Sequence, residues 1–154
     1  MLEWLQSTAL STWIREADSL WAFPGILTFH TLGLAVLVGA ATVVDLRVLG
    51  VGGKMPLRSM RPLFRVMWFG FIINAITGTL LFAADATRRG TSGFFMMKLA
   101  FVAIGVVTIA LIQRHLNAPA ADPLVPNAAA RRLALVSLVV WTAAITAGRL
   151  LAYI

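Results

Sequence analysis

The chain has 154 residues, of which 60% are apolar and only 12% are charged. A soluble domain usually carries about 25% charged and about 45–50% apolar residues. The composition therefore nearly excludes a soluble globular enzyme, excludes a disordered tail, and leaves room for one membrane domain. The chain has no cysteine, which excludes disulfides, thiolate metal sites, iron–sulfur clusters and covalent haem attachment.

The formal net charge is +7, from 13 Lys and Arg against 6 Asp and Glu. In a soluble protein this excess would suggest binding to nucleic acid. Here most basic residues lie between hydrophobic runs, where the positive-inside rule accounts for them. We therefore expect a lipid bilayer, and not a nucleic acid, as the principal partner.

Residues 1–20 mix apolar and charged side chains, unlike the rest of the chain. We do not expect a secretory signal, because the segment lacks a basic start and an uninterrupted apolar core. At helical spacing its apolar side chains share one broad face, which predicts an amphipathic helix at the membrane interface. This face comprises Leu2, Leu5, Leu10, Trp13 and Ile14.

Four hydrophobic runs follow, at about 22–48, 64–84, 93–112 and 133–153. Each is long enough to cross roughly 30 Å of hydrocarbon at about 1.5 Å per helical residue. We therefore predict an all-α membrane protein whose single domain covers residues 1–154. Its expected architecture is an up-down bundle of four transmembrane helices with an N-terminal amphipathic interfacial helix.

The basic residues of the connections predict the orientation of this bundle. Eight belong to the side of the first and third connections: Arg47, Lys54, Arg58, Arg61, Arg65, Arg114, Arg131 and Arg132. Five belong to the opposite side: Arg15, Arg88, Arg89, Lys98 and Arg149. The side with more Lys and Arg normally faces the cytoplasm. We expect a multi-pass protein of the bacterial inner (cytoplasmic) membrane with both termini outside.

Ionisable side chains inside membrane spans are costly, so each one suggests a functional site. His30 lies about eight residues into the first span, roughly 12 Å below its outer boundary at about 1.5 Å per residue. Lys98 and Arg149 fall in the same outer half, although both are long enough to snorkel to the surface. His30 cannot snorkel, and a hydrogen bond between helices, to residues such as Thr28, Asn74 or Thr77, would satisfy it.

The alternative role for His30 is that of a metal ligand, since neutral imidazole commonly binds metals and haem iron. Gly33 follows one turn later, where it could leave room for a flat macrocycle or simply permit close helix packing. Lys98 and Arg149 could neutralise the propionates of a haem. We predict a b-type haem that is held by His30 and bound by Gly33, Lys98 and Arg149.

Other polar and sulfur-containing residues have simpler expected roles. Asp45 and Arg47 are expected to form an ion pair at the end of the first span or to pair with the connection that follows it, and His115 is expected to lie at the surface. Met96 and Met97 are expected to be apolar filler. They could instead bind Cu(I) together with His30, so copper is the alternative cofactor.

Two stretches resemble known families. Phe29-His30-Thr31-Leu32-Gly33, running on to Asp45-Leu46-Arg47, resembles the first helix of small four-helix bacterial membrane proteins of the CopD-like and HemJ-like superfamily. Residues 94–102, with the later His115, resemble a HemJ-like segment with an aromatic-rich start and a Lys-Leu pair. HemJ-like proteins are b-haem-associated protoporphyrinogen oxidases, and CopD-like proteins are linked to copper handling. The resemblance implies His30 as haem ligand and Lys98 as a second pocket residue, in a separate branch of the superfamily.

The predicted function is electron transfer in the membrane by a b-type haem protein. A redox partner protein, a quinone or a second copy of the chain is expected as the partner. Three alternatives stay open: an enzyme resembling protoporphyrinogen oxidase, a copper-handling membrane protein, and a structural subunit in which His30 only links helices.

Overall fold

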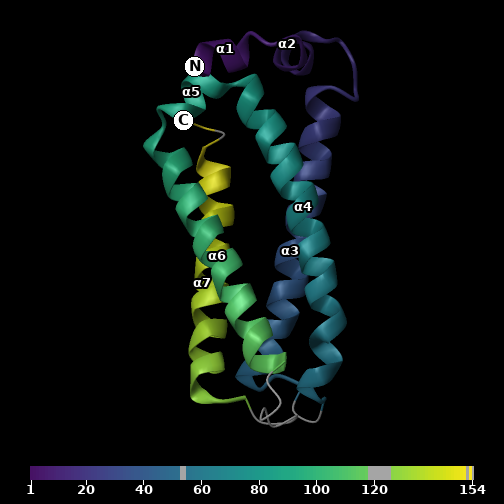
Figure 1. The fold of residues 1–154 in the computed structure, drawn as a ribbon, viewed down its shortest axis with the longest axis vertical. Helices are drawn as coiled ribbons and strands as arrows, with labels where there is room; N and C mark the ends of the chain where they lie inside the picture. Colours follow the sequence, from purple (N-terminus) through teal and green to yellow (C-terminus); the bar gives the residue numbers. More distant parts are fainter. Residues whose placement is uncertain (53–54, 118–125, 152, 154) are drawn as a thin grey trace.

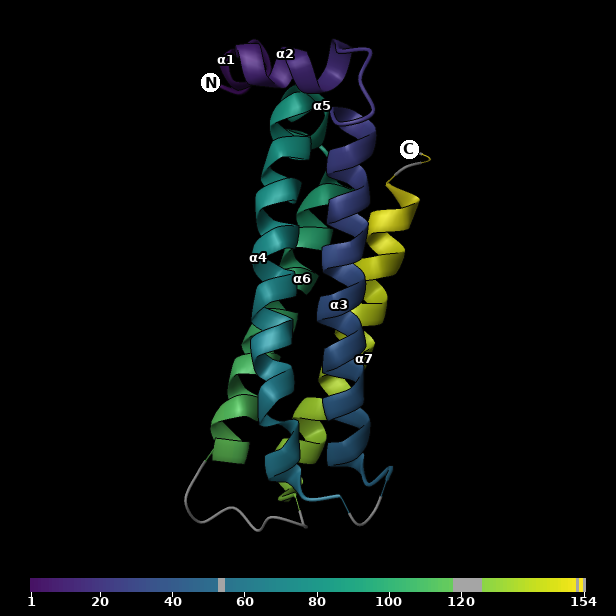
Figure 2. The same ribbon diagram turned by 90° about the vertical axis from the view of Figure 1, so that its right-hand side faces the viewer.

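The computed structural model describes residues 1–52, 55–117, 126–151 and 153, among which there are helices and no strand. Four long helices form the body of the molecule: α3 (Phe23–Leu49), α4 (Arg61–Ala84), α6 (Gly93–Asn117) and α7 (Ala128–Leu150). All four are long and apolar enough to cross a membrane. They run alternately up and down side by side (Figures 1 and 2), which confirms the predicted all-α membrane bundle of a multi-pass protein.

Local signals fix where the spanning helices begin and end. Gly50 ends α3 in the left-handed region, at a φ of 110° that glycine adopts without strain. The side chain of Asn127 accepts a hydrogen bond from the backbone N–H of Ala130 at 2.8 Å and so caps the start of α7. Because of this cap, α7 begins earlier than the hydrophobic run from 133. Helix α6 also extends beyond its hydrophobic run and ends at Asn117.

The N-terminal segment folds into two short helices, α1 (Leu2–Gln6) and α2 (Ala9–Glu16), where we expected one helix over residues 1–20. The break lies at Thr8, whose side chain accepts a hydrogen bond from the backbone N–H of Ser11 at 3.3 Å and caps α2. Both helices lie across the end of the bundle together with α5 (Ala86–Gly90) (Figures 1 and 2). We call this end the cap end. The opposite end, which carries the 3-10 helix η1 (Leu57–Met60), is the η1 end.

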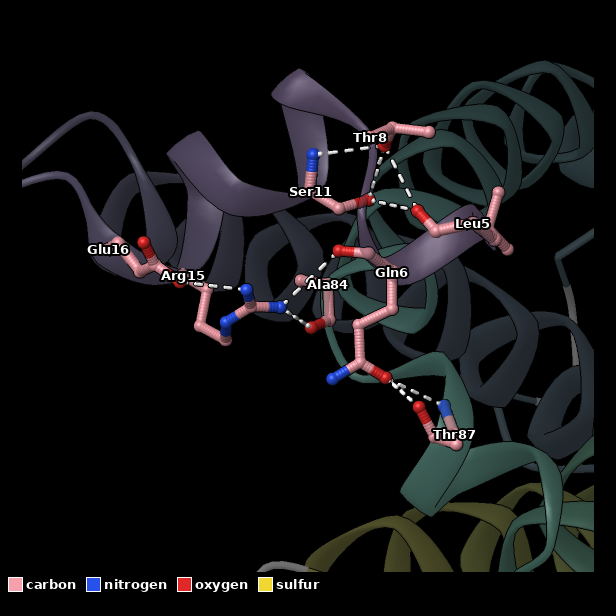
Figure 3. A network of polar contacts seen from close by, with 8 residues as sticks. All are labelled: Leu5, Gln6, Thr8, Ser11, Arg15, Glu16, Ala84 and Thr87. Atoms are coloured by element: carbon pink, nitrogen blue, oxygen red, sulfur yellow. Dashed lines mark hydrogen bonds and ion pairs between the residues drawn. The ribbon is translucent and has the colours of Figure 1, made fainter. Parts of the chain in front are cut away.

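Hydrogen bonds fasten the N-terminal helices to the bundle, as Figure 3 shows. The Arg15 guanidinium donates to the carbonyl of Ala84, the last residue of α4, at 3.2 Å. The Gln6 side-chain oxygen accepts from the backbone N–H of Thr87 at 3.0 Å and also from the Thr87 hydroxyl. Helix ends leave carbonyl and N–H groups without partners inside the helix. The N-terminal segment satisfies such groups at the junction of α4 and α5.

Gln6→Ala is expected to speed hydrogen exchange of the Thr87 amide about fivefold, because a typical hydrogen bond contributes about 1 kcal/mol. Exchange measured by mass spectrometry on peptides covering α5 checks this. Glu16→Ala is the matched control, since Glu16 forms an exposed ion pair with Arg15 at 2.8 Å and exposed pairs contribute little. Equal exchange in the wild type and in Gln6→Ala would show that the contact does not hold the cap in place.

The apolar core occupies the η1 half of the bundle. Its buried members are Leu37, Ala40, Ala41, Val44, Val48, Leu57, Met60, Phe64, Met67, Ile109, Ile112, Leu116, Ala130, Ala134, Trp141 and Ala144. In contrast, no residue of α6 from Gly93 to Ile104 is buried, whereas Gly105 and residues beyond it are. Burial of α6 is therefore confined to its η1 half, and the cap half of this helix, which carries Lys98, is only partly buried or exposed.

Candidate functional site

His30 lies on the face of α3 that packs against α4. Its Nδ1 lies 3.1 Å from the backbone oxygen of Asn74 and 3.1 Å from Thr77 Oγ1. The Asn74 side-chain amide donates in return to the His30 carbonyl at 2.9 Å. A Cβ at Gly78 would lie only 3.0 Å from His30 Cε1, so the absence of a side chain there makes room for the ring. The half-buried imidazole is therefore held in place by α4.

The partners of Nδ1 indicate which ring nitrogen carries the proton. The Asn74 carbonyl can only accept, and the Thr77 hydroxyl donates to the Ile73 carbonyl at 2.6 Å, which leaves its oxygen as an acceptor. With acceptors on both contacts, Nδ1 must be the donor in this hydrogen-bond network. In a neutral imidazole the lone pair then lies on Nε2, the nitrogen that remains able to bind a metal.

Lys98 extends from α6 to the backbone of α7. A Cβ at Gly148 would lie 3.3 Å from Lys98 Cε and 3.6 Å from Nζ, so this glycine makes room for the lysine. The half-buried ammonium group interacts electrostatically with His30 on α3 and with Arg89 beside α6. The structure thus brings Lys98 and His30, which are 68 positions apart (98 − 30), to one level of the bundle.

The other two predicted site residues take different positions. Gly33 is buried against α4, where a Cβ would lie 3.1 Å from both Asn74 N and Gly70 O. This space is filled by α4 and is not left for a macrocycle, so Gly33 serves close helix packing. Arg149 is exposed near the cap end, with its guanidinium carbon 5.9 Å from the centre of the Tyr153 ring. It neighbours Gly148 in the sequence, and among the described residues it forms no hydrogen bond with His30.

The residues considered for a copper site or a second ligand lie apart from His30 or face outward. Met96 and Met97 are both exposed on α6. His115 Nδ1 is 2.8 Å from the Leu111 carbonyl of its own helix, near the η1 end. Within the part of the chain that the structure describes, no three or more His, Asp or Glu side chains gather as a metal site.

The charge around the candidate site is positive. Asp85 forms an ion pair with Arg89 at 3.3 Å, across one turn at the cap end. Lys98 lies near this pair and has no ion pair with a carboxylate among the described residues. An anionic group would therefore be a complementary partner for Lys98.

Two glycines of the site escaped sequence reasoning. Gly78 accommodates the His30 ring and Gly148 accommodates the Lys98 side chain. Glycine is common in membrane helices and normally indicates close packing, so its presence alone gave no sign of these roles.

The comparison with known protein families places the whole chain in one family. A model of a family of unknown function, DUF6644, matches residues 1–154. The chain belongs to the DUF6644 family. No curated protein and no solved structure matches it. Because the match includes α1, α2 and all four long helices, the DUF6644 domain comprises the cap together with the bundle.

Proposed function

We propose that this DUF6644 protein binds a b-type haem through His30 and transfers electrons within the membrane. The observation that carries the proposal is the contact of His30 Nδ1 with the Asn74 carbonyl and the Thr77 hydroxyl. Metal-binding histidines usually donate their second ring N–H to a carbonyl or carboxylate, which fixes the ring and directs the other nitrogen to the metal. His30 has this arrangement on the first spanning helix.

The residues of the cap half fit a haem in both ligand type and charge. His30 Nε2 would bind the haem iron, and the Lys98 ammonium would pair with a propionate carboxylate. The unburied half of α6 would offer apolar side chains such as Phe101 and Val102 to the macrocycle, since both pack beside the core and are only partly buried. Haem bound here would supply reversible one-electron oxidation and reduction.

Location and partners follow as parts of the same proposal. The excess of basic residues near the η1 end supports an orientation with this end in the cytoplasm and both termini outside, in a bacterial inner membrane. The described residues form spanning helices and a short cap. We therefore propose that electrons are exchanged with a separate redox protein, a quinone or a second copy of the chain. The resemblance to CopD-like and HemJ-like proteins agrees with a haem ligand at His30.

A structural role for His30 is the second candidate, because its bonds with Asn74 and Thr77 also join α3 to α4. Titration of haem into the detergent-purified protein separates the two. We expect saturable binding of about one haem per chain, with a Soret band of a histidine-ligated haem. Binding that never saturates, as for haem dissolving in micelles, would favour the structural role.

Lys98→Met is expected to weaken haem retention about tenfold, equivalent to about 1.4 kcal/mol, because it keeps the side-chain length and removes the charge. Lys98→Arg should retain most of the affinity. Arg149→Met should have a smaller effect, since Arg149 is exposed beside Tyr153. The rate of haem transfer to an excess of a soluble apo-haem protein measures these changes. Wild-type retention in Lys98→Met would show that Lys98 only reaches toward the membrane surface.

A further inference from the structure

A second buried polar cluster lies in the η1 half, away from His30. Asp45, Ser137 and Trp141 are 2%, 0% and 2% exposed. Among the described residues, Asp45 Oδ2, Ser137 Oγ and Trp141 Nε1 have no hydrogen-bond partner. Buried polar atoms are nearly always paired with protein groups or ordered water. The three atoms need a further partner, because the Ser137 hydroxyl reaches the Asp45 carboxylate without completing a hydrogen bond of good geometry, and no described group accepts from Trp141 Nε1.

The three side chains come from two packed helices, α3 and α7. Ser137 and Trp141 are four residues apart on α7 and so lie one above the other on one face. Asp45 of α3 faces this part of α7, with its carboxylate near enough to interact with the Ser137 hydroxyl. Ser137 Oγ and Asp45 Oδ2 nevertheless form no direct hydrogen bond of normal geometry. Polar groups that approach each other without bonding directly are commonly bridged by water.

Helix α6 packs against the same cluster, and its Gly105 contacts the indole ring of Trp141. A Cβ at Gly105 would lie 2.7 Å from Trp141 Cε2 and 2.8 Å from Cζ2, so the ring packs directly on this glycine. Thr108, one turn away on the same helix, is buried and donates its hydroxyl to the Gly105 carbonyl at 2.7 Å. The indole is therefore packed against α6, and no described group accepts from its N–H.

The role expected for Asp45 from the sequence, an ion pair with Arg47, does not fit this geometry. Arg47 Nε donates to the Met55 carbonyl at 2.6 Å in the connection that follows α3. Residues two apart on a helix point to different faces. The Asp45 carboxylate accordingly faces α7 while Arg47 turns to the connection.

We propose that one water molecule binds between Asp45, Ser137 and Trp141 inside the bundle. The indole N–H can only donate, a carboxylate can only accept, and the serine hydroxyl can do both. A metal cation would be repelled by the indole N–H and an anion by the carboxylate. Water accepts from Trp141 and donates to Asp45 and Ser137, so it satisfies all three unpaired atoms. The proposal does not depend on the haem.

Nuclear Overhauser transfer between water and indole N–H protons tests the site in the full-length protein, labelled with ¹⁵N-tryptophan in lipid nanodiscs. Trp141 Nε1–H is expected to show a cross-peak to a long-lived water. Trp68 is the matched control, because its Nε1–H donates to Gln113 Oε1 at 3.0 Å; its signal should lack this cross-peak. Trp141→Phe assigns the resonance. A Trp141 signal without the water cross-peak would overturn the proposal.

Ser137→Ala removes one of the three partners with little change in volume. It is expected to reduce the Trp141 water cross-peak at least twofold, whereas Asp45→Asn, which retains a hydrogen-bonding side chain, should preserve most of it. An undiminished cross-peak in Ser137→Ala would contradict a water held by all three groups. The wild-type measurement decides the proposal even where a variant does not fold.

Discussion

Replacing His30 with alanine is expected to remove essentially all haem from the protein while leaving it inserted in the membrane. Alanine offers no ligand, and the described part of the bundle holds no second histidine at this level, since His115 lies near the other end of α6. The haem content per chain, determined from the pyridine haemochrome spectrum after equal purification, measures the effect. His115→Ala is the control and should keep wild-type haem.

Loss of haem in His30→Ala could also follow from the loss of the bonds to Asn74 and Thr77. Added imidazole separates the two causes, because it can occupy the space of the missing ring and act as a ligand without restoring the covalent link to α3. Recovery of the Soret band with imidazole would support a ligand role. Wild-type haem content in His30→Ala without imidazole would refute it.

Gly70→Ala is expected to destabilise the bundle by about 1–3 kcal/mol, a typical effect of overpacking. A Cβ at Gly70 would lie 2.8 Å from Leu37 N and 2.9 Å from Gly33 O. These are backbone atoms, so α3 and α4 would have to separate, and membrane helices depend on such close approaches at small residues. Unfolding by a denaturing detergent in mixed micelles, followed by tryptophan fluorescence, measures the loss.

Gly39→Ala is the matched control for Gly70→Ala. A Cβ at Gly39 would meet no atom within 4 Å, and alanine is the better helix former. It should be neutral or slightly stabilising. Because Asn74 lies one turn beyond Gly70, Gly70→Ala should also weaken haem binding by displacing His30 from its partners. Equal stability of the two variants would show that the α3–α4 crossing is looser than the structure indicates.

The spanning helices were predictable because apolar runs of this length have few alternatives to crossing a membrane. Their ends were less predictable, because polar residues such as Arg114 and His115 extend α6 beyond its hydrophobic run. Asn127 starts α7 before the apolar run begins, through a cap that hydropathy does not reflect. Likewise, the Thr8 cap divides the N-terminal segment into two helices.

At the candidate site, the sequence predicted the shared level of His30 and Lys98, which follows from depth in an antiparallel bundle. Of the three partners considered for His30, Asn74 and Thr77 contact it, whereas Thr28 bonds the Pro24 carbonyl of its own helix. The sequence did not predict which way Gly33 faces. A helix that is apolar on nearly all sides carries no hydrophobic stripe to fix its rotation, so its Gly33 could equally have faced a cofactor or α4. The approach of Asp45 to Ser137 was missed for a different reason, because Ser137 is distant in the sequence and Arg47 is near.

The most direct test of the proposed function is the visible absorption spectrum of the detergent-purified protein before and after reduction with dithionite. A non-covalent b-type haem predicts a Soret band, with α and β bands that sharpen on reduction. A featureless spectrum from protein produced with an ample supply of haem would contradict the electron-transfer proposal and leave the linking of α3 to α4 as the role of His30.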